Sequence, residues 1–329
     1  MTSLIIGNTP LIKVEEIYTK LECTNPCGSI KDRIAKYIIE ESEKKGILKS
    51  GMTIVEATSG NTGIAFSYFG KEKGYKVTII MPENMTEERK EIIKKLGANL
   101  IECSSEGSFA EAAQIRDNLA NNSNYFNPDQ FSNPLNVECH EKTTGQEILA
   151  QIINYTDKPI DAFVAGVGTG GTLIGVGKAL RKINPNVHIV AVEPTESAVM
   201  SGGKPGEHGI SGIGDGFIPA IASNGEHGMN EMINEVICVS TEEAKDAARH
   251  LEETHGFCVG ISSGSNFVAA KKLKEKYETV VTVFADGYPR YKSRGLKQSQ
   301  KGRCPYERSR IDVLLRKDVP DEFKKLMNE

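Results

Sequence analysis

Short apolar runs alternate with longer stretches of helical periodicity along most of the 329-residue chain. The runs are rich in Val and Ile, as at 76–81 and 279–284, which is typical of buried strands. The stretches between them repeat apolar residues three and four positions apart, which predicts amphipathic helices. We expect strands at 17–21, 53–56, 76–81, 99–102, 162–165, 188–192, 235–239 and 279–284, and helices at 62–73, 87–96, 109–120, 144–153, 172–183, 242–255 and 266–276, with an earlier helix that ends near Gly46.

Strands that alternate with helices favour an α/β fold with largely parallel sheets. The long loop at 127–136 suggests a change from one group of βα units to another, and 329 residues are long enough for two domains. We therefore expect a two-lobed molecule. In such folds ligands bind in crevices at the C-terminal ends of the strands.

The composition, with 39% hydrophobic and 26% charged residues, is that of a globular protein. A formal net charge of −4 gives no electrostatic reason to expect nucleic acid or an anionic membrane as a partner. We expect no membrane span and no signal peptide, because no apolar run approaches ~20 residues and no basic region precedes an apolar core. Seven scattered cysteines without a CxxC pair favour a reducing compartment, hence the cytoplasm, and argue against a structural zinc site.

The segment 25–33, Asn-Pro-Cys-Gly-Ser-Ile-Lys-Asp-Arg, carries the first candidate for chemistry. Its proline and glycine predict a turn, and Ser29 with Asp32 has the pattern of a capping box that opens a helix. Lys31 then lies in the first helical turn, where the positive end of the helix dipole disfavours an ammonium group. A neutral lysine amine can form a Schiff base with an aldehyde, although this segment alone fits an ordinary solvated lysine better.

Three glycine-rich turns follow expected strands and open expected helices. The turn 58–63, Thr-Ser-Gly-Asn-Thr-Gly, gathers backbone N–H groups and hydroxyls that suit an anion such as a carboxylate. The turn 166–172, Gly-Val-Gly-Thr-Gly-Gly-Thr, permits close backbone approach at a helix N-terminus and so predicts a phosphate cradle. The third turn, 260–265, fits an ordinary tight helix start equally well.

The turn 166–172 has a second interpretation as a dinucleotide-binding site. Three of its glycines match the dinucleotide fingerprint, and Glu193 ends the next expected strand, where an acid that binds a ribose is expected. This interpretation predicts an NAD-dependent dehydrogenase. It leaves Lys31 and the turn 58–63 without a role.

Together these stretches resemble the cysteine synthase and cystathionine β-synthase group of pyridoxal-phosphate enzymes, which have the tryptophan synthase β-like fold (fold type II). The resemblance covers about residues 4–293, and its motifs occur in family order. It implies a larger cofactor-binding domain from 1–37 and 144–329, a smaller mobile substrate-binding domain from 38–143, and a homodimer. The matching segments are 6–11, 25–33, 58–63, 130–134, 140–145, 166–172, 191–194, 212–214, 217–219 and 260–264.

The resemblance implies pyridoxal 5'-phosphate as cofactor and assigns roles to single residues. Lys31 is the implied Schiff-base lysine, which also takes the Cα proton of the substrate, and Asn61 is implied to hydrogen-bond the ring hydroxyl of the cofactor. The implied phosphate ligands are Gly168, Thr169, Gly170, Gly171 and Thr172. The implied ligands of the substrate carboxylate are Thr58, Ser59, Thr62 and Gln130.

Two positions depart from the family pattern. Asp215 stands where cysteine synthases usually have a small residue. A carboxylate there could act as a general base on water or a thiol, and it could repel hydrosulfide. It could also be only a solvated acid of the loop. In the segment 285–291, Asp286 or Gly287 takes the place of the Ser or Thr that usually faces the ring nitrogen. An aspartate there would protonate the nitrogen, whereas a glycine would leave it to water, and both remain open.

These observations support three hypotheses on function. The first is β-replacement of the cysteine synthase type, from O-acetyl-L-serine and sulfide to L-cysteine and acetate. A close variant consumes L-cysteine and releases hydrogen sulfide, forming serine or lanthionine, with Asp215 activating the nucleophile. The third is a scaffold that keeps only the fold. The substrate is expected to be a small amino acid, with no metal bound.

Overall fold

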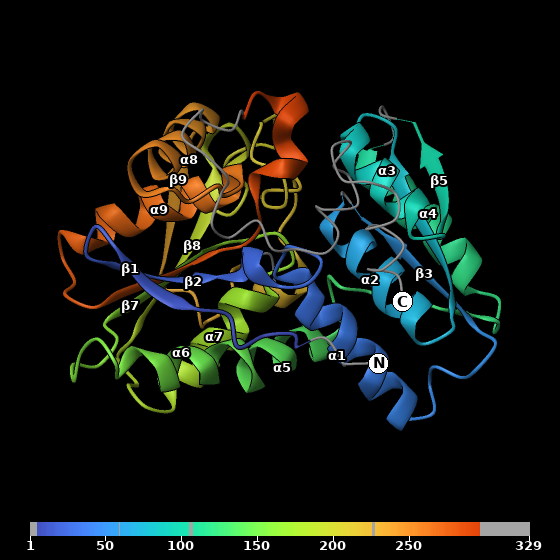
Figure 1. The fold of residues 1–329 in the computed structure, drawn as a ribbon, viewed down its shortest axis with the longest axis horizontal. Coiled ribbons are helices and arrows are strands. Elements are labelled where there is room, and N and C mark those ends of the chain that lie inside the picture. Colours follow the sequence, from blue (N-terminus) through green and yellow to red (C-terminus); the bar gives the residue numbers. More distant parts are fainter. Residues whose placement is uncertain (1–4, 59, 105–107, 226–227, 297–329) are drawn as a thin grey trace, which may run out of the picture.

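The computed structural model describes residues 5–58, 60–104, 108–225 and 228–296, which form two lobes around two separate sheets (Figure 1). The larger sheet has six strands in the order β1-β2-β10-β7-β8-β9. Only β1 and β2 pair antiparallel, and the other neighbours are parallel. These strands are β1 (Leu11–Val14), β2 (Ile17–Leu21), β7 (Ala162–Gly166), β8 (His188–Pro194), β9 (Glu235–Val239) and β10 (Val280–Phe284).

The second sheet has four parallel strands in the order β5-β4-β3-β6. They are β3 (Thr53–Ala57), β4 (Lys76–Pro82), β5 (Asn99–Cys103) and β6 (Tyr125–Phe126). With α2 (Asn61–Glu72), α3 (Glu87–Lys95) and α4 (Ser108–Ala120) they make the smaller lobe on the right of Figure 1. All of these elements lie within the predicted smaller domain 38–143.

The remaining helices pack in pairs around the larger sheet. Helix α8 (Thr241–His255) packs on α9 (Ile261–Lys274), and α5 (Pro134–Lys142) packs on α7 (Gly171–Arg181) and on α1 (Lys31–Lys44). Helix α6 (Thr144–Ile152) contacts α7 and β1. Short 3-10 helices complete the described elements at η1 (Glu22–Thr24), η2 (Thr195–Ser197), η3 (Ala220–Ala222) and η4 (Tyr288–Arg294).

The pattern of apolar runs therefore predicted the fold class correctly, although several local elements differ from the prediction. Helix α5 was expected to be loop, and α9 begins five residues before the expected start at Asn266. The prediction of a capping box from Ser29 and Asp32 is wrong. The N-cap of α1 is Ile30, whose side chain makes no cap bond. The Asp32 carboxylate instead accepts a 2.5 Å hydrogen bond from the Cys27 backbone N–H. A carboxylate that folds back onto the preceding turn fixes the turn rather than the helix end.

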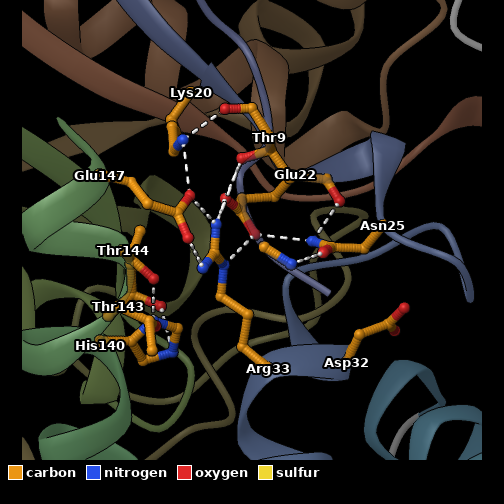
Figure 2. A network of polar contacts seen from close by, with 12 residues as sticks. Thr9, Lys20, Glu22, Asn25, Asp32, Arg33, His140, Thr143, Thr144 and Glu147 are labelled. Atoms are coloured by element: carbon orange, nitrogen blue, oxygen red, sulfur yellow. Dashed lines mark hydrogen bonds and ion pairs between the residues drawn. The ribbon is translucent and has the colours of Figure 1, made fainter. Parts of the chain in front are cut away.

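A buried polar network fastens the N-terminal end of α1 to the larger sheet (Figure 2). Arg33 donates to both oxygens of Glu22 at 2.7 and 2.8 Å and to both oxygens of Glu147 at 2.8 and 2.7 Å. The Lys20 ammonium lies 2.8 Å from Glu147 as well. Two cations and two carboxylates thus neutralise one another away from water, as buried charges must. Since Lys31 lies two residues before Arg33, the network fixes the position of that lysine.

Within the described residues, we find no helix with the length and apolar character needed to cross a membrane.

Candidate active site

A single pocket between the two lobes brings together residues from the segment 25–33 and from all three glycine-rich turns. Lys31, the first residue of α1, lies in it beside Asn61 at the start of α2 and Asp286 after β10. It is lined by Thr58, Asn61, Thr62 and Gln130, by Gly168, Thr169, Gly170 and Thr172, and by Lys31, Asp215 and Asp286. Of the other two expected site residues, Gly171 is buried next to this lining, and Ser59 lies outside the described residues.

The environment of Lys31 favours its neutral amine. Burial lowers the pKa of the Lys31 ammonium below its usual value, while the carboxylates of Asp215 and Asp286 act in the opposite direction. In the described part of the chain no side chain forms a hydrogen bond or an ion pair with this ammonium. The direction agrees with the sequence-based expectation, but the main cause is loss of solvation rather than the helix dipole.

The turn after β3 is built as expected for an anion site. Thr58 accepts a hydrogen bond from the Gly60 backbone N–H at 3.1 Å, and the Thr62 hydroxyl donates to the Gln130 side chain at 2.7 Å. Gln130 is only 3% exposed and comes from the loop before α5, which is distant from this turn in the chain. The hydroxyls and the amide therefore converge at the N-terminus of α2, where a carboxylate is stabilised.

The turn after β7 closes around the N-terminus of α7. Gly170 is its N-cap, in the left-handed region at φ 84°, which a side chain disfavours. At Gly168 a Cβ would lie 2.3 Å from the Gly212 carbonyl oxygen, so this approach needs a glycine as well. The backbone N–H groups at the start of a helix suit a phosphate.

Two buried oxygen atoms that accept no hydrogen bond show whether these residues fit pyridoxal phosphate. The Oδ1 atoms of Asn61 and Asp286 are both buried and have no hydrogen-bond partner in the structure. The two side chains touch, since Asn61 Nδ2 donates to Asp286 Oδ2 at 2.6 Å. Unsatisfied buried acceptors are costly, and the ring hydroxyl and a protonated ring nitrogen of pyridoxal phosphate are donors of the kind that could satisfy them. The residues present therefore fit the cofactor.

Asp215 lies in a loop at the side of the pocket facing a second cavity lined by Phe109, Phe131 and Phe217. The loop owes its shape to Gly214 and Gly216, with φ of 70° and 83°. Burial raises the pKa of the Asp215 carboxyl, and His208 and Lys31 oppose that rise. A half-buried carboxyl with a raised pKa can accept and return a proton.

Four residues of this region were missed from sequence. Asn136 links the loop that carries Gln130 to the turn 166–172, because its Nδ2 donates to the Gln130 carbonyl at 2.8 Å and to Thr169 Oγ1 at 2.9 Å. His140 Nε2 lies 3.3 Å from Thr172 Oγ1. Arg89 lines the pocket from α3, and Tyr291 of η4 contacts it from the other lobe. The motif 140–145 was a signal for His140, whereas nothing marked Arg89 among the charged residues of α3.

The structure gives Glu193 a different role from the ribose-binding one that the dehydrogenase interpretation requires. Glu193 is 1% exposed and accepts hydrogen bonds from the backbone N–H groups of Met200 at 2.8 Å and Ser201 at 2.9 Å. Its carboxylate is thus committed to the loop after β8. It does not line the pocket that contains the glycine turn.

The fold and the pocket define an α/β enzyme with a buried amine between a phosphate cradle and a carboxylate site. The pyridoxal-phosphate-dependent enzyme family matches residues 2–286, so the chain belongs to that family and its cofactor is pyridoxal 5'-phosphate. This result confirms the predicted fold class and cofactor.

Three known proteins illustrate what the chain is similar to. A cysteine synthase from Staphylococcus aureus is 45% identical over 300 residues, which is 88% of this chain and 94% of that protein. A solved cysteine synthase from Entamoeba histolytica is 35% identical with a TM-score of 0.81, covering 98% of this chain and 94% of the other. A solved hydrogen sulfide-producing enzyme from Fusobacterium nucleatum is 39% identical with a TM-score of 0.82, covering 91% of each chain. These findings confirm the prediction of an enzyme of the cysteine synthase type.

Proposed function

We propose that the chain exchanges the β-substituent of O-acetyl-L-serine for sulfide, giving L-cysteine and acetate. The observation that carries this proposal is the placement of Lys31 in one pocket with the turn 58–63 and the turn 166–172. The cysteine synthases among the relatives support it. Pyridoxal phosphate supplies the electron sink when bound.

The roles of the residues follow from their positions. Thr58, Thr62 and Gln130 hold the α-carboxylate of the substrate, since their hydroxyl and amide groups meet at the N-terminus of α2. The phosphate of the cofactor lies against the residues 168–172. Lys31, once displaced, takes the proton from the substrate Cα, a task that suits an amine whose pKa burial has lowered.

A second candidate function is the release of hydrogen sulfide from L-cysteine. Asp215 favours it, because a carboxyl with a raised pKa beside Lys31 can take a proton from water or from a thiol that attacks Cβ. The relative from Fusobacterium nucleatum is described as a hydrogen sulfide-producing enzyme. The two candidates share all other residues of the site.

One pair of reactions separates the two candidates. The purified holoenzyme is given O-acetyl-L-serine with sulfide, or L-cysteine alone, and L-cysteine, sulfide, serine and lanthionine are quantified. We expect faster turnover in the first reaction. Faster sulfide release from L-cysteine would make the second candidate the main function, and no turnover in either reaction would reject both.

Asp215→Asn tests the role of the carboxylate. We expect sulfide release from L-cysteine to fall by about a hundredfold or more, as is typical when a general base is lost. The reaction of O-acetyl-L-serine with sulfide should not slow, because the variant also loses a negative charge that repels hydrosulfide. Glu207→Gln is the matched control, because Glu207 is an exposed acid that lines the neighbouring groove with Asp215. Equal sulfide release by Asp215→Asn and the wild type would show that Asp215 is only a loop acid.

Lys31→Ala tests the cofactor lysine. We expect the yellow near-visible absorption band of the holoenzyme to disappear in this variant, because the amine that bonds the cofactor aldehyde is gone. An unchanged band in Lys31→Ala would place the attachment elsewhere.

Three further expectations belong to the same proposal. Residues 38–143 form a smaller domain that moves when the carboxylate binds, and small-angle scattering should then show compaction. The enzyme is a homodimer, which sedimentation would detect as twice the 35.9 kDa chain mass. It works in the cytoplasm, which fits the lack of disulfides among the cysteines of the described ranges, and fractionation of cells would test this.

A further inference from the structure

The carboxylate of Asp286 is held by two neighbours that the proposed reaction does not use. It is 1% exposed and follows β10 in the wall of the pocket. Its Oδ2 accepts a hydrogen bond from the Tyr291 hydroxyl at 2.6 Å and one from Asn61 Nδ2 at 2.6 Å. Its Oδ1 is the buried acceptor without a donor.

Tyr291 can act only as a donor to this carboxylate. Its side chain is 0% exposed, and burial together with the charge of Asp286 raises the pKa of the hydroxyl far above its usual value. The hydroxyl therefore stays protonated. A hydrogen bond to a carboxylate is short and strong in a buried site, so it fixes the orientation of the Asp286 side chain.

Arg89 covers the ring of Tyr291 from the smaller lobe. Its guanidinium carbon lies 4.9 Å from the ring centroid, a cation–π contact. The side chain is 2% exposed, and among the described residues no carboxylate forms a salt bridge with it. The guanidinium therefore packs against Tyr291 and limits the positions that its ring, and so its hydroxyl, can take.

The backbone around the carboxylate leaves no room for another side chain. A Cβ at Gly260 would lie 2.0 Å from Asp286 Oδ1 and 2.6 Å from Tyr291 Cε2. The adjacent Gly287 offers no side chain and does not line the pocket. Of the two residues considered for the ring nitrogen, only Asp286 thus presents an acceptor.

We propose that Tyr291 and Arg89 are positioning residues that hold the Asp286 carboxylate in place as the partner of the protonated ring nitrogen of the cofactor. The two acceptors without a donor are the Oδ1 atoms of Asp286 and Asn61, and these two side chains are in contact. The nitrogen and the hydroxyl of the pyridine ring likewise lie along one edge of that ring. This inference rests on the binding of pyridoxal phosphate at Lys31. A carboxylate opposite the nitrogen keeps the ring cationic and strengthens it as an electron sink.

The protonation of the ring nitrogen can be read directly. The apoenzyme is loaded with pyridoxal phosphate labelled with nitrogen-15 in the ring, and the nitrogen NMR signal is followed from pH 6 to pH 9. We expect the wild-type signal to be that of a protonated nitrogen throughout. In Asp286→Asn it should be that of a neutral nitrogen, and in Tyr291→Phe the midpoint of protonation should fall by about one pH unit or more, as expected when a hydrogen bond to a charged group is lost.

Arg89→Met should move the midpoint in the same direction by a smaller amount, because its stem still covers the ring while the charge is gone. Tyr288→Phe is the matched control, a buried tyrosine of the same 3-10 helix that does not line the pocket, and it should leave the midpoint unchanged. Gly287→Ser adds a hydroxyl at the alternative position, where the nearest contact of a Cβ is 3.3 Å, and should also leave the signal unchanged.

Two outcomes would overturn the inference. One is a neutral ring nitrogen in the wild type, and the other is a response to Gly287→Ser but none to Asp286→Asn. In either case the absorption band that depends on Lys31 would still be present. Loss of the cofactor from Lys31 would instead appear as a missing band in the wild type, so failure of this inference and failure of the cofactor site are distinguishable.

Discussion

Replacing Arg33 by methionine tests how strongly the network of Figure 2 stabilises the protein. The substitution keeps the apolar stem of the side chain but removes four hydrogen bonds to Glu22 and Glu147. Glu22 is 0% exposed and would keep only Lys20 as a nearby cation. Removing one member of a buried ion pair typically costs about 3–5 kcal/mol, because the other charge stays buried without compensation.

The titration of Glu147 gives an independent measure. Burial raises the pKa of its carboxyl, but hydrogen bonds and charge from Arg33 and Lys20 outweigh burial and lower it from 4.5 to about 2. A shift of this size corresponds to roughly 3 kcal/mol. Since the folded-state pKa is depressed, this stabilisation is complete above pH 4.5 and is lost as the pH falls toward 2.

Urea unfolding of wild type and Arg33→Met, followed by circular dichroism at pH 7 and at pH 3.5, would check both values. We expect a difference of about 3–5 kcal/mol at pH 7 that narrows at pH 3.5. Lys36→Met is the control, because Lys36 is 41% exposed and its pair with Glu40 should contribute less than about 1 kcal/mol. A cost below about 1 kcal/mol for Arg33→Met, or one independent of pH, would refute this account.

Two further predictions concern the site and its support. In Gly168→Ala the new Cβ would lie 2.3 Å from the Gly212 carbonyl oxygen, so the cradle must distort, and titration of the apoenzyme should show at least a tenfold weaker affinity for pyridoxal phosphate. Gly177→Ala should not weaken the affinity, because its Cβ would meet only side-chain atoms, of Met232 at 3.2 Å and of Ile189 at 3.4 Å. Glu56 is buried, which raises its pKa to about 7, so the folded state keeps a proton that the unfolded state releases above about pH 4.5. The free energy of unfolding of the wild type should therefore fall as the pH rises from 4.5 to 7, by up to roughly 3 kcal/mol from this group. Urea unfolding at pH 5 and pH 8 should show a smaller fall for Glu56→Gln than for the wild type. An identical fall in both proteins would contradict the raised pKa of Glu56.

Sequence patterns gave the exact bounds of some strands that lie between clear turns. Strand β2 was expected at 17–21 and β9 at 235–239, and both have these bounds in the structure, because short apolar runs between turns have few alternatives. Helix α5 was missed because its apolar positions show little periodicity. It is surrounded by α1 and α7 and takes its stability from packing rather than from an amphipathic face.

The site was predictable where one short segment builds it and not where segments meet in space. The turns 58–63 and 166–172 carry their chemistry in consecutive residues, so spacing alone identified them. The contact of Arg89 with Tyr291 joins residues from the two lobes, and the bonds of Asn136 join two turns that are distant in the chain. Such contacts depend on tertiary structure, which periodicity does not contain.

The charge states of Lys31 and Asp215 connect the two candidate reactions. Burial lowers the pKa of Lys31 and raises the pKa of Asp215, so it favours the neutral form of each group. The charge of each group acts in the opposite direction and favours the ionised form of the other. Their titrations are therefore coupled. When Asp215 is ionised it repels an anionic nucleophile such as hydrosulfide and can accept a proton from a neutral one, such as water or a thiol. When it is protonated the repulsion disappears and so does the base. The same carboxyl thus opposes cysteine synthesis from hydrosulfide in the state in which it promotes attack by water or thiol. If Asp215 has the proposed role, the balance between the candidate functions depends on the ionisation of this one residue.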